Sequence, residues 1–370
     1  MSDDASHEPA RVDAMVAGRK DAHLDLCLEA DVGAPGLTTG LGGYALEYDA
    51  LPEVDLDRVD LSTTIAGKAL RAPIVVGAMT GGTERAGVIN ARLARAAARC
   101  GVGMALGSQR AMIVDPTLRS TFAARDAAPD LPLLFANVGL VQLNYGVTTE
   151  QIRDAMAAVD ADALNLHTNP LQEAIQPEGD IRFAGLGAQI PPLCEALGDT
   201  PVFLKEVGAG VGPRAAAKLA ALPLAGIEVS GVGGTSWAKV ESFRAPDDSP
   251  QRIVGRRLAG FGIPTGASVQ FCRAAFGTSR TVVASGGIRT GMDIAVALAL
   301  GADVAALARP LLEAADESED RAVALLETLI YELRVICFCT GSPDVASLRQ
   351  VAVVPPGGHW AARAMGMTSS

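Results

Sequence analysis

The stretch LNLHTNPLQEAIQPEGD, residues 164–180, places a cluster of polar side chains directly after a short apolar run. Residues 162–166 have the length and boundaries of a buried strand. Pro170 discourages the chain from continuing as strand or helix, so we expect a loop there. In alternating β/α proteins, ligands bind at loops that follow the carboxyl ends of strands. The side chains that this loop offers as a hard-cation ligand set are His167, Asn169, Gln172, Glu173, Glu178 and Asp180.

Working outward from this stretch, eight apolar runs predict strands at 73–79, 102–106, 132–138, 162–166, 201–205, 226–230, 281–285 and 303–308. Helical patterns lie between them at 88–100, 149–158, 183–197, 212–221, 266–276 and 291–300, and a last helix is expected at about 320–338. This alternation predicts an α/β protein with a closed (β/α)8 TIM barrel. An open doubly wound sheet is the alternative, but no early G-x-G-x-x-G fingerprint supports it.

The expected organisation has three parts. Residues 1–70 form an N-terminal extension, in which 1–18 are expected to be flexible and 19–70 to mix one short helix with turns. Residues 71–345 form the barrel, and 346–370 form a C-terminal tail. An irregular insert at 236–265, with three prolines, follows the sixth strand and is a candidate lid over the site.

Composition limits the functional classes. The formal net charge is −11 and no basic block is present, which argues against nucleic-acid binding and favours a small phosphate ligand held by local groups. No secretory signal or membrane span is visible in the sequence, so we expect a cytoplasmic protein with six reduced cysteines. Cys337 and Cys339 are interpreted as apolar fillers of the last helix.

Almost every predicted strand ends in a polar residue or a glycine. Gly286 and Gly287 after strand seven, and Arg309 after strand eight, occupy the loops where barrels often bind phosphate. The alternative is that these glycines only form βα turns. Lys205 ends an apolar strand, where it could form a Schiff base, lie against the polar edge of a cofactor, or pair with a nearby acid. His167 and Glu173 are candidates for catalysis and for Mg²⁺ binding, against core and loop-capping roles.

Taken together, these motifs resemble the type 2, flavin-dependent isopentenyl-diphosphate isomerases. The resemblance covers about residues 19–345 and rests on Arg19-Lys20-x-x-His23, MTGG at 79–82, GSQR at 107–110, the long motif from His167 to Asp180, KEVG at 205–208, SGxGGTSW at 230–237, SGGIRTG at 285–291 and ARP at 308–310. The departures are Thr168, Ala209 and Val232, and none of them removes a functional group.

The resemblance implies FMN bound across the barrel mouth, NADPH as the reductant of the flavin, and Mg²⁺ bound by Glu173. The implied FMN contacts are Met79, Thr80, Gly81, Ser108, Asn137, Lys205, Ser230, Thr235, Gly286, Gly287, Arg289, Ala308 and Arg309. The implied substrate contacts are Arg19, Lys20, Ser108, Arg110, His167, Asn169 and Gln172. From the residues alone, Arg19 and Lys20 are most simply a solvated helix start.

The implied reaction interconverts isopentenyl and dimethylallyl diphosphate without net redox change, with reduced FMN as the acid–base catalyst. Gln172, Glu241 and His167 are the candidate catalytic side chains, and Trp237 could stabilise a cationic transition state. The resemblance also implies a homo-oligomer, a tetramer or larger. A 2-hydroxy-acid oxidase would need a histidine in the sixth-strand loop, and residues 230–238 contain none. A flavin-binding protein without catalysis is the non-enzymatic alternative.

Overall fold

The computed structural model describes the backbone of residues 8–357. Side chains are described for residues 20–357, so that of Arg19 is not included. Its centre is a closed barrel of eight parallel strands in the order β10-β11-β4-β5-β6-β7-β8-β9. The barrel strands are β4 (Ile74–Val76), β5 (Gly103–Ala105), β6 (Leu134–Gly139), β7 (Ala163–Thr168), β8 (Val202–Glu206), β9 (Gly226–Glu228), β10 (Thr281–Ala284) and β11 (Val304–Leu307). All eight lie within or overlap the predicted strands, so the predicted (β/α)8 barrel is confirmed.

The barrel interior is packed at the end away from the site. Phe135 on β6 and Phe203 on β8 meet inside it in an edge-to-face contact with ring centroids 5.2 Å apart. A short antiparallel hairpin, β2 (Thr63–Ile65) and β3 (Lys68–Leu70), adds Ile65 and Leu70 to the same buried cluster. This end is therefore filled and closed, which leaves the carboxyl ends of the strands as the open face.

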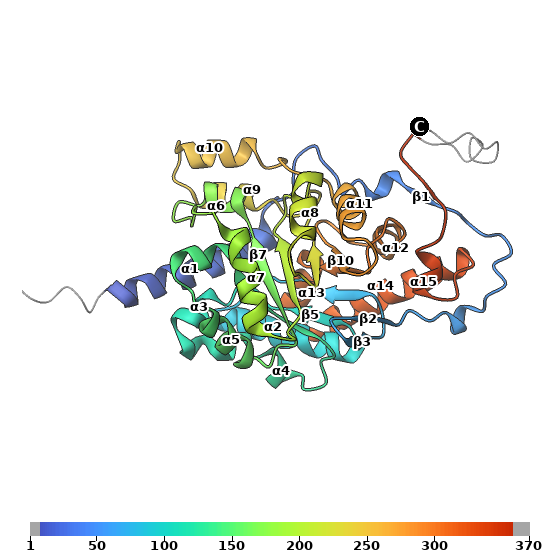
Figure 1. The fold of residues 1–370 in the computed structure, drawn as a ribbon, viewed down its shortest axis with the longest axis horizontal. Helices are drawn as coiled ribbons and strands as arrows, with labels where there is room; N and C mark the ends of the chain where they lie inside the picture. Colours follow the sequence, from blue (N-terminus) through green and yellow to red (C-terminus); the bar gives the residue numbers. More distant parts are fainter. Residues whose placement is uncertain (1–7, 358–370) are drawn as a thin grey trace, which may run out of the picture.

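Helices cover the outside of the barrel (Figure 1). The helices that match predicted ones are α2 (Glu84–Cys100), α5 (Thr149–Ala157), α7 (Leu186–Leu197), α8 (Pro213–Ala220), α11 (Thr265–Phe276), α12 (Gly291–Ala299) and α14 (Glu319–Cys339). Further helices are α3 (Arg110–Val114), α4 (Ala124–Ala127), α13 (Arg309–Glu317) and α15 (Val345–Leu348), with 3-10 turns at Leu41–Gly43, Leu56–Arg58, Pro116–Phe122 and Leu140–Tyr145. The sequence prediction missed α13, because its apolar pattern is short and directly precedes α14.

Three local predictions were wrong. One long helix, α1 (Glu8–Glu29), forms where flexible chain to residue 18 and a short helix after it were expected, and residues 1–7 of that expectation lie outside the described residues. Pro170 does not prevent a helix but begins one, α6 (Pro170–Ile175), because proline is tolerated at the first helical position. The insert is not irregular: it contains α9 (Trp237–Arg244) and α10 (Pro250–Arg257), each capped by a serine side chain.

The short helices α6, α9 and α10, which come from the loops after β7 and β9, pack together at one end of the molecule, where α1 also lies (Figure 1). At the opposite side, β1 (Ala45–Leu46) pairs antiparallel with β12 (Val353–Val354). The segments expected as N-terminal extension and C-terminal tail are thus joined by a small sheet. Among the described residues, the structure contains no helix whose length and apolarity would allow it to cross a bilayer.

Candidate active site

A cavity of about 220 Å³ opens at the carboxyl ends of the barrel strands. Residues from the ends of all eight strands line it, and α1 covers part of it with Lys20, His23, Leu24 and Cys27. The sequence-predicted residues that line the cavity are Lys20, Met79, Thr80, Ser108, Arg110, Asn137, His167, Asn169, Gln172, Glu173, Lys205, Ser230, Thr235, Gly286, Gly287, Arg289, Ala308 and Arg309. Residues separated by almost 300 positions are thus brought into one site, as the barrel requires.

Four predicted residues of the described chain do not line the cavity: Gly81, Glu178, Asp180 and Glu241. A Cβ on Gly81 would lie 2.0 Å from the ring of Phe122, so this glycine serves close packing behind the wall rather than ligand contact. Glu241 is fully buried and reaches the cavity through two side chains that line it, Gln172 and His23. Arg19 lies in α1, and its side chain is outside the described part of the structure.

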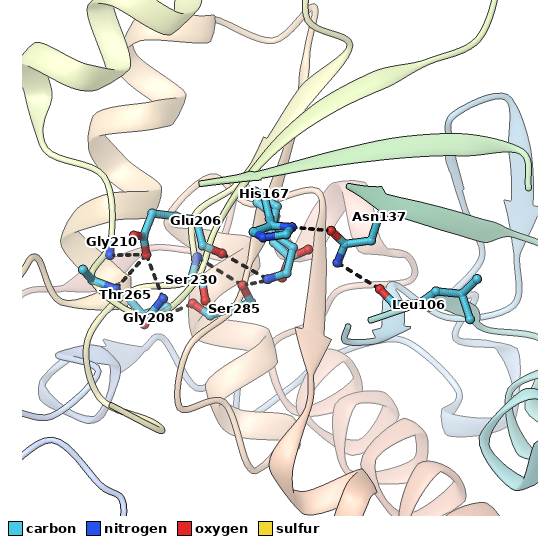
Figure 2. Close-up of polar contacts among 12 residues, drawn as sticks. Leu106, Asn137, His167, Glu206, Gly208, Gly210, Ser230, Thr265 and Ser285 are labelled. Atoms are coloured by element: carbon cyan, nitrogen blue, oxygen red, sulfur yellow. Dashed lines mark hydrogen bonds and ion pairs between the residues drawn. The ribbon is translucent and has the colours of Figure 1, made fainter. Parts of the chain in front are cut away.

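A chain of hydrogen bonds fixes His167 on the cavity wall (Figure 2). Asn137 donates from Nδ2 to the carbonyl of Leu106 at 2.9 Å, so its Oδ1 faces Nδ1 of His167, 2.8 Å away. The Nδ1 atom therefore carries the proton and donates it to Asn137. Burial, with the nearby charges of Lys20, Lys205 and Arg110, lowers the pKa of His167 to about 3. His167 is neutral, and its Nε2 is the free acceptor.

The polar loop after β7 forms a second network. Glu173 accepts from Asn169 Nδ2 through Oε1 at 2.9 Å and from the backbone N–H of Asp180 through Oε2 at 2.7 Å. Asp180 in turn holds Arg110 in an ion pair and accepts from Gln142 at 2.9 Å. Burial raises the pKa of Glu173, although these hydrogen bonds oppose the shift. Asn169 and Asp180 are thus both held by the carboxylate of Glu173.

The side chain of Gln172 is held in place by the buried carboxylate of Glu241. Its Nε2 donates to Glu241 Oε1 at 2.8 Å, and Nε2 of His23 lies 2.9 Å from the same oxygen. Arg244 binds the other oxygen of Glu241 and also Glu178. Burial by itself raises the pKa of Glu241, but the contacts with His23, Gln172 and Arg244 outweigh it and lower that pKa. Glu241 is therefore an ionised anchor that joins α1, α6 and α9. The sequence left His23 without a role, and only its contact with Glu241 reveals one.

Lys205 is paired with an acid that sequence reasoning did not single out. Its Nζ lies 2.5 Å from Oε1 of Glu228 on the next strand, and the ammonium also donates to the carbonyl of Glu206. The ion pair does not remove Lys205 from the site, because both side chains line the cavity. The signal was present in the sequence: Glu228 interrupts an apolar strand, as Lys205 does, and a lone buried charge is costly.

The loop after β8 is organised by the carboxylate of Glu206 (Figure 2). One of its oxygens accepts the backbone N–H groups of Gly208, Ala209 and Gly210 at 2.6–2.9 Å. Burial raises the pKa of Glu206 to about 7, against these backbone hydrogen bonds. The loop is thus held in a fixed shape and presents Val207 and Gly208 to the cavity.

Glycines bring the backbones of the last βα loops together. A Cβ on Gly234 would lie 2.6 Å from the backbone N of Gly287, and Gly286 and Gly287 have φ of 97° and 78°. These two glycines line the cavity through their backbones, and Arg309 at the start of α13 lines it as well. A helix start, exposed backbone and a guanidinium are suited to a phosphate group.

Comparisons with known proteins agree with this geometry. The chain is 48% identical over 348 residues to the isopentenyl-diphosphate delta-isomerase of a Synechococcus strain. This alignment covers 94% of this chain and 99% of the relative. The chain belongs to the isopentenyl-diphosphate delta-isomerase family. Other members that it resembles come from a Nostoc strain, at 46% identity over 91% of this chain, and from Deinococcus radiodurans, at 42% identity over 94%.

Residues 187–355 of this isomerase-family chain also match the FMN-dependent dehydrogenase family. Among solved structures, it is similar to a mandelate oxidase bearing a monooxide FMN adduct, with a TM-score of 0.62 and 19% identity over 94% of this chain and 99% of that chain. A second mandelate oxidase structure, with (S)-2-phenylpropionate, gives a TM-score of 0.62 at 20% identity over 93% of this chain and 97% of that chain. At this identity the likeness shows the shared barrel fold.

Proposed function

We propose that this protein interconverts isopentenyl diphosphate and dimethylallyl diphosphate in isoprenoid biosynthesis, with reduced FMN and without net redox change. The proposal rests on one observation. The loops of Gly286, Gly287 and Arg309, which are suited to bind phosphate, line the same cavity as the polar stretch from His167 to Glu173. The family membership supports the substrate pair, and the match of residues 187–355 supports FMN.

The polar groups of the cavity wall are suited to bind FMN. The hydroxyl oxygen of Thr80 is buried without a hydrogen-bond partner, and Thr80 lines the cavity. Such an atom normally has a partner, so a polar ligand edge would satisfy it. The phosphate of FMN would lie on the backbone of Gly286 and Gly287 beside Arg309, and Lys205 would face the polar edge of the ring.

The opposite side of the cavity fits a diphosphate and a divalent cation. Lys20 and Arg110 supply positive charge there, with Ser108, Gln172 and, as the resemblance implies, Arg19 as further substrate ligands. Glu173 keeps a second lone pair on each oxygen, and Oδ1 of the adjacent Asn169 is buried without a partner. Among the described residues no cluster of three potential metal-binding side chains occurs, so a Mg²⁺ ion bound by Glu173 would be completed by substrate oxygens and water.

When bound and reduced, FMN would supply the acid–base chemistry at the alkene. The chain's own residues would hold the diphosphate through Lys20 and Arg110 and fix the amide of Gln172 against Glu241. The neutral His167 would accept a hydrogen bond through Nε2. Leu24 and Cys27 of α1 would limit the access of water to the apolar part of the substrate. The ring of Trp237, which lines the cavity, would stabilise developing positive charge.

The proposal includes NADPH as the reductant of the flavin, and a cytoplasmic homo-oligomer of four or more subunits. The free state of all six cysteines is consistent with a reducing compartment. Light scattering of the purified protein measures the number of subunits, and a monomer would contradict the assembly.

The test of the function is an anaerobic assay of the purified protein with FMN, Mg²⁺ and isopentenyl diphosphate, with and without dithionite or NADPH. Dimethylallyl diphosphate is followed by NMR. Many turnovers per reducing equivalent are expected. A flavin that binds and is reduced while the substrate stays unchanged would contradict the isomerase function and favour hydride transfer or binding alone.

A further inference from the structure

Glu228 is a buried carboxylate on the cavity wall that the proposed reaction does not use. It lies on β9 with only 4% of its surface exposed. Its Oε1 atom is 2.5 Å from Nζ of Lys205, its register partner on β8. The same oxygen accepts from the hydroxyl of Ser285, just beyond β10, at 2.9 Å. Three neighbouring strands therefore converge on one carboxylate oxygen.

The residues on either side of the contact between Glu228 and Lys205, Ser285 and Glu206, are themselves held by hydrogen bonds. Ser285, which donates to Glu228, also accepts the backbone N–H of Ser230 at 3.1 Å (Figure 2). Glu206, the residue beside Lys205, uses its carboxylate for the backbone of residues 208–210, so its contact with the ammonium is through its carbonyl alone. Glu228 is thus the carboxylate that balances the charge of Lys205.

This balance affects the cavity because both side chains line it. The other charged residues that line the cavity belong to other parts of it: Lys20, Arg110 and Glu173 lie on the side that we assign to the diphosphate and Mg²⁺, and Arg289 and Arg309 belong to the loops that we assign to the FMN phosphate. In a buried site the Coulomb energy between charges is far larger than in water. Removal of the Glu228 charge would leave the Lys205 ammonium uncompensated next to any ligand ring.

On the basis of the proposed FMN site, we propose that Glu228 is a positioning residue that balances Lys205 and so keeps the reduction potential of the bound flavin low. Reduction adds two electrons from the reductant and one proton from solvent, which leaves the flavin ring with one additional negative charge. An uncompensated ammonium favours that charge, and the Glu228 carboxylate opposes it. Glu228 acts through Lys205 and needs no contact with the reacting atoms.

The test compares the FMN complexes of the wild type, Glu228→Gln, Glu228→Asp and Asp303→Asn. The dissociation constant of oxidised FMN is measured by fluorescence, and the midpoint potential by anaerobic dithionite titration against a reference dye. Glu228→Gln is expected to bind reduced relative to oxidised FMN about tenfold more tightly, a rise of about 30 mV for a two-electron couple. Glu228→Asp keeps the charge and is expected to restore most of the wild-type potential.

Asp303→Asn is the matched control, because Asp303 also pairs with a cation at 2.5 Å, Arg273, but lies at the start of β11, away from the cavity. It should leave the potential unchanged. An unchanged potential in Glu228→Gln, or an equal rise in the control, would overturn the proposal. A wild type that does not bind FMN would overturn the proposed function as well, and the two failures are thereby distinguished.

If Glu228→Gln does not fold, Lys205→Gln and the double variant Lys205→Gln, Glu228→Gln provide the same test. The single variant leaves an unbalanced carboxylate and should lower the potential. The double variant removes both charges and should lie above the single one. Equal potentials of the two would overturn the proposal.

Discussion

His167 illustrates how a single proton is fixed by backbone geometry. Its Nδ1 proton is held by Asn137, which is oriented by the carbonyl of Leu106. With three cations nearby and little exposure, a second proton is disfavoured, and the pKa falls to about 3. The unfolded chain, with a histidine pKa near 6.5, takes up a proton below that pH that the folded chain does not.

We therefore expect His167 to make stability fall as the pH falls from about 6.5 towards 3. Replacement by Gln should remove this part of the pH dependence. Between pH 6.5 and 5 the wild type should lose about 1–2 kcal/mol more unfolding free energy than His167→Gln. Urea unfolding at both pH values measures the difference. Parallel losses in both proteins would show that His167 is protonated in the folded state.

Asp180 is a second residue whose role depends on its partners. It holds Arg110 and Gln142 by its side chain and Glu173 by its backbone N–H. Asp180→Asn keeps the backbone contact and the shape but releases Arg110. We expect the KM for isopentenyl diphosphate to rise about tenfold, since a hydrogen bond to a charged group contributes about 1.5–3 kcal/mol. The kcat should change by less than about threefold.

The control for this prediction is Asp126→Asn, which removes the partner of Arg119 in an exposed ion pair. Exposed pairs contribute about 0–1 kcal/mol, so neither KM nor kcat should change. Steady-state kinetics with NMR detection measures both variants. A fall in kcat at constant KM in Asp180→Asn would instead assign the network to the chemical step.

At the scale of elements, the same arrangement of side chains occurs twice in the barrel. Asp162 directly precedes β7, accepts the N–H of Leu134 on β6 and pairs with Arg125. Asp303 directly precedes β11, accepts the N–H of Val282 on β10 and pairs with Arg273. The preceding helices, α5 and α12, both begin with a threonine capping box. The two strand pairs lie four strands apart along the barrel order.

These aspartates fix the starts of strands at the end of the barrel opposite the cavity. Asp162→Asn and Asp303→Asn should therefore each reduce the free energy of unfolding by about 2 kcal/mol, through a weakened charged hydrogen bond. The two losses should add in the double variant, because the sites are far apart. Urea unfolding measures them, and FMN affinity should stay unchanged. A clear non-additivity would mean that the two halves of the barrel are coupled.

At the scale of the whole molecule, the cavity collects backbone and side chains from every barrel strand and from α1. A ligand bound there contacts the folded chain only, so it should stabilise the whole barrel against unfolding. FMN at 100 times its dissociation constant should add about 2.7 kcal/mol to the free energy of unfolding. Removal of FMN by dialysis should reverse the gain.

Thermal unfolding with and without FMN measures this effect, with riboflavin as the matched control. Riboflavin lacks the phosphate that we assign to the loops of Gly286, Gly287 and Arg309, so it should stabilise less. Equal stabilisation by both ligands would contradict the phosphate site.

The sequence by itself determined the eight strands, most of the helices between them, and the ring of polar residues and glycines at the strand ends. These features are local, because strand and helix periodicity and turn residues are read within a window of about ten residues. The resemblance of the motifs then named the candidate site residues, and most of them line the cavity.

Only the tertiary structure decided which of these residues act together. Three examples each join separate elements. Lys205 pairs with Glu228, Gln172 is anchored by Glu241 and His23, and Gly81 packs closely against Phe122. Such contacts depend on the barrel register and on the path of α1 over the mouth, which no local pattern encodes. The sequence supplied the chemical groups, and the folded chain determined their partners, because the register between neighbouring strands and the packing of α1 against the loops exist only in the tertiary structure.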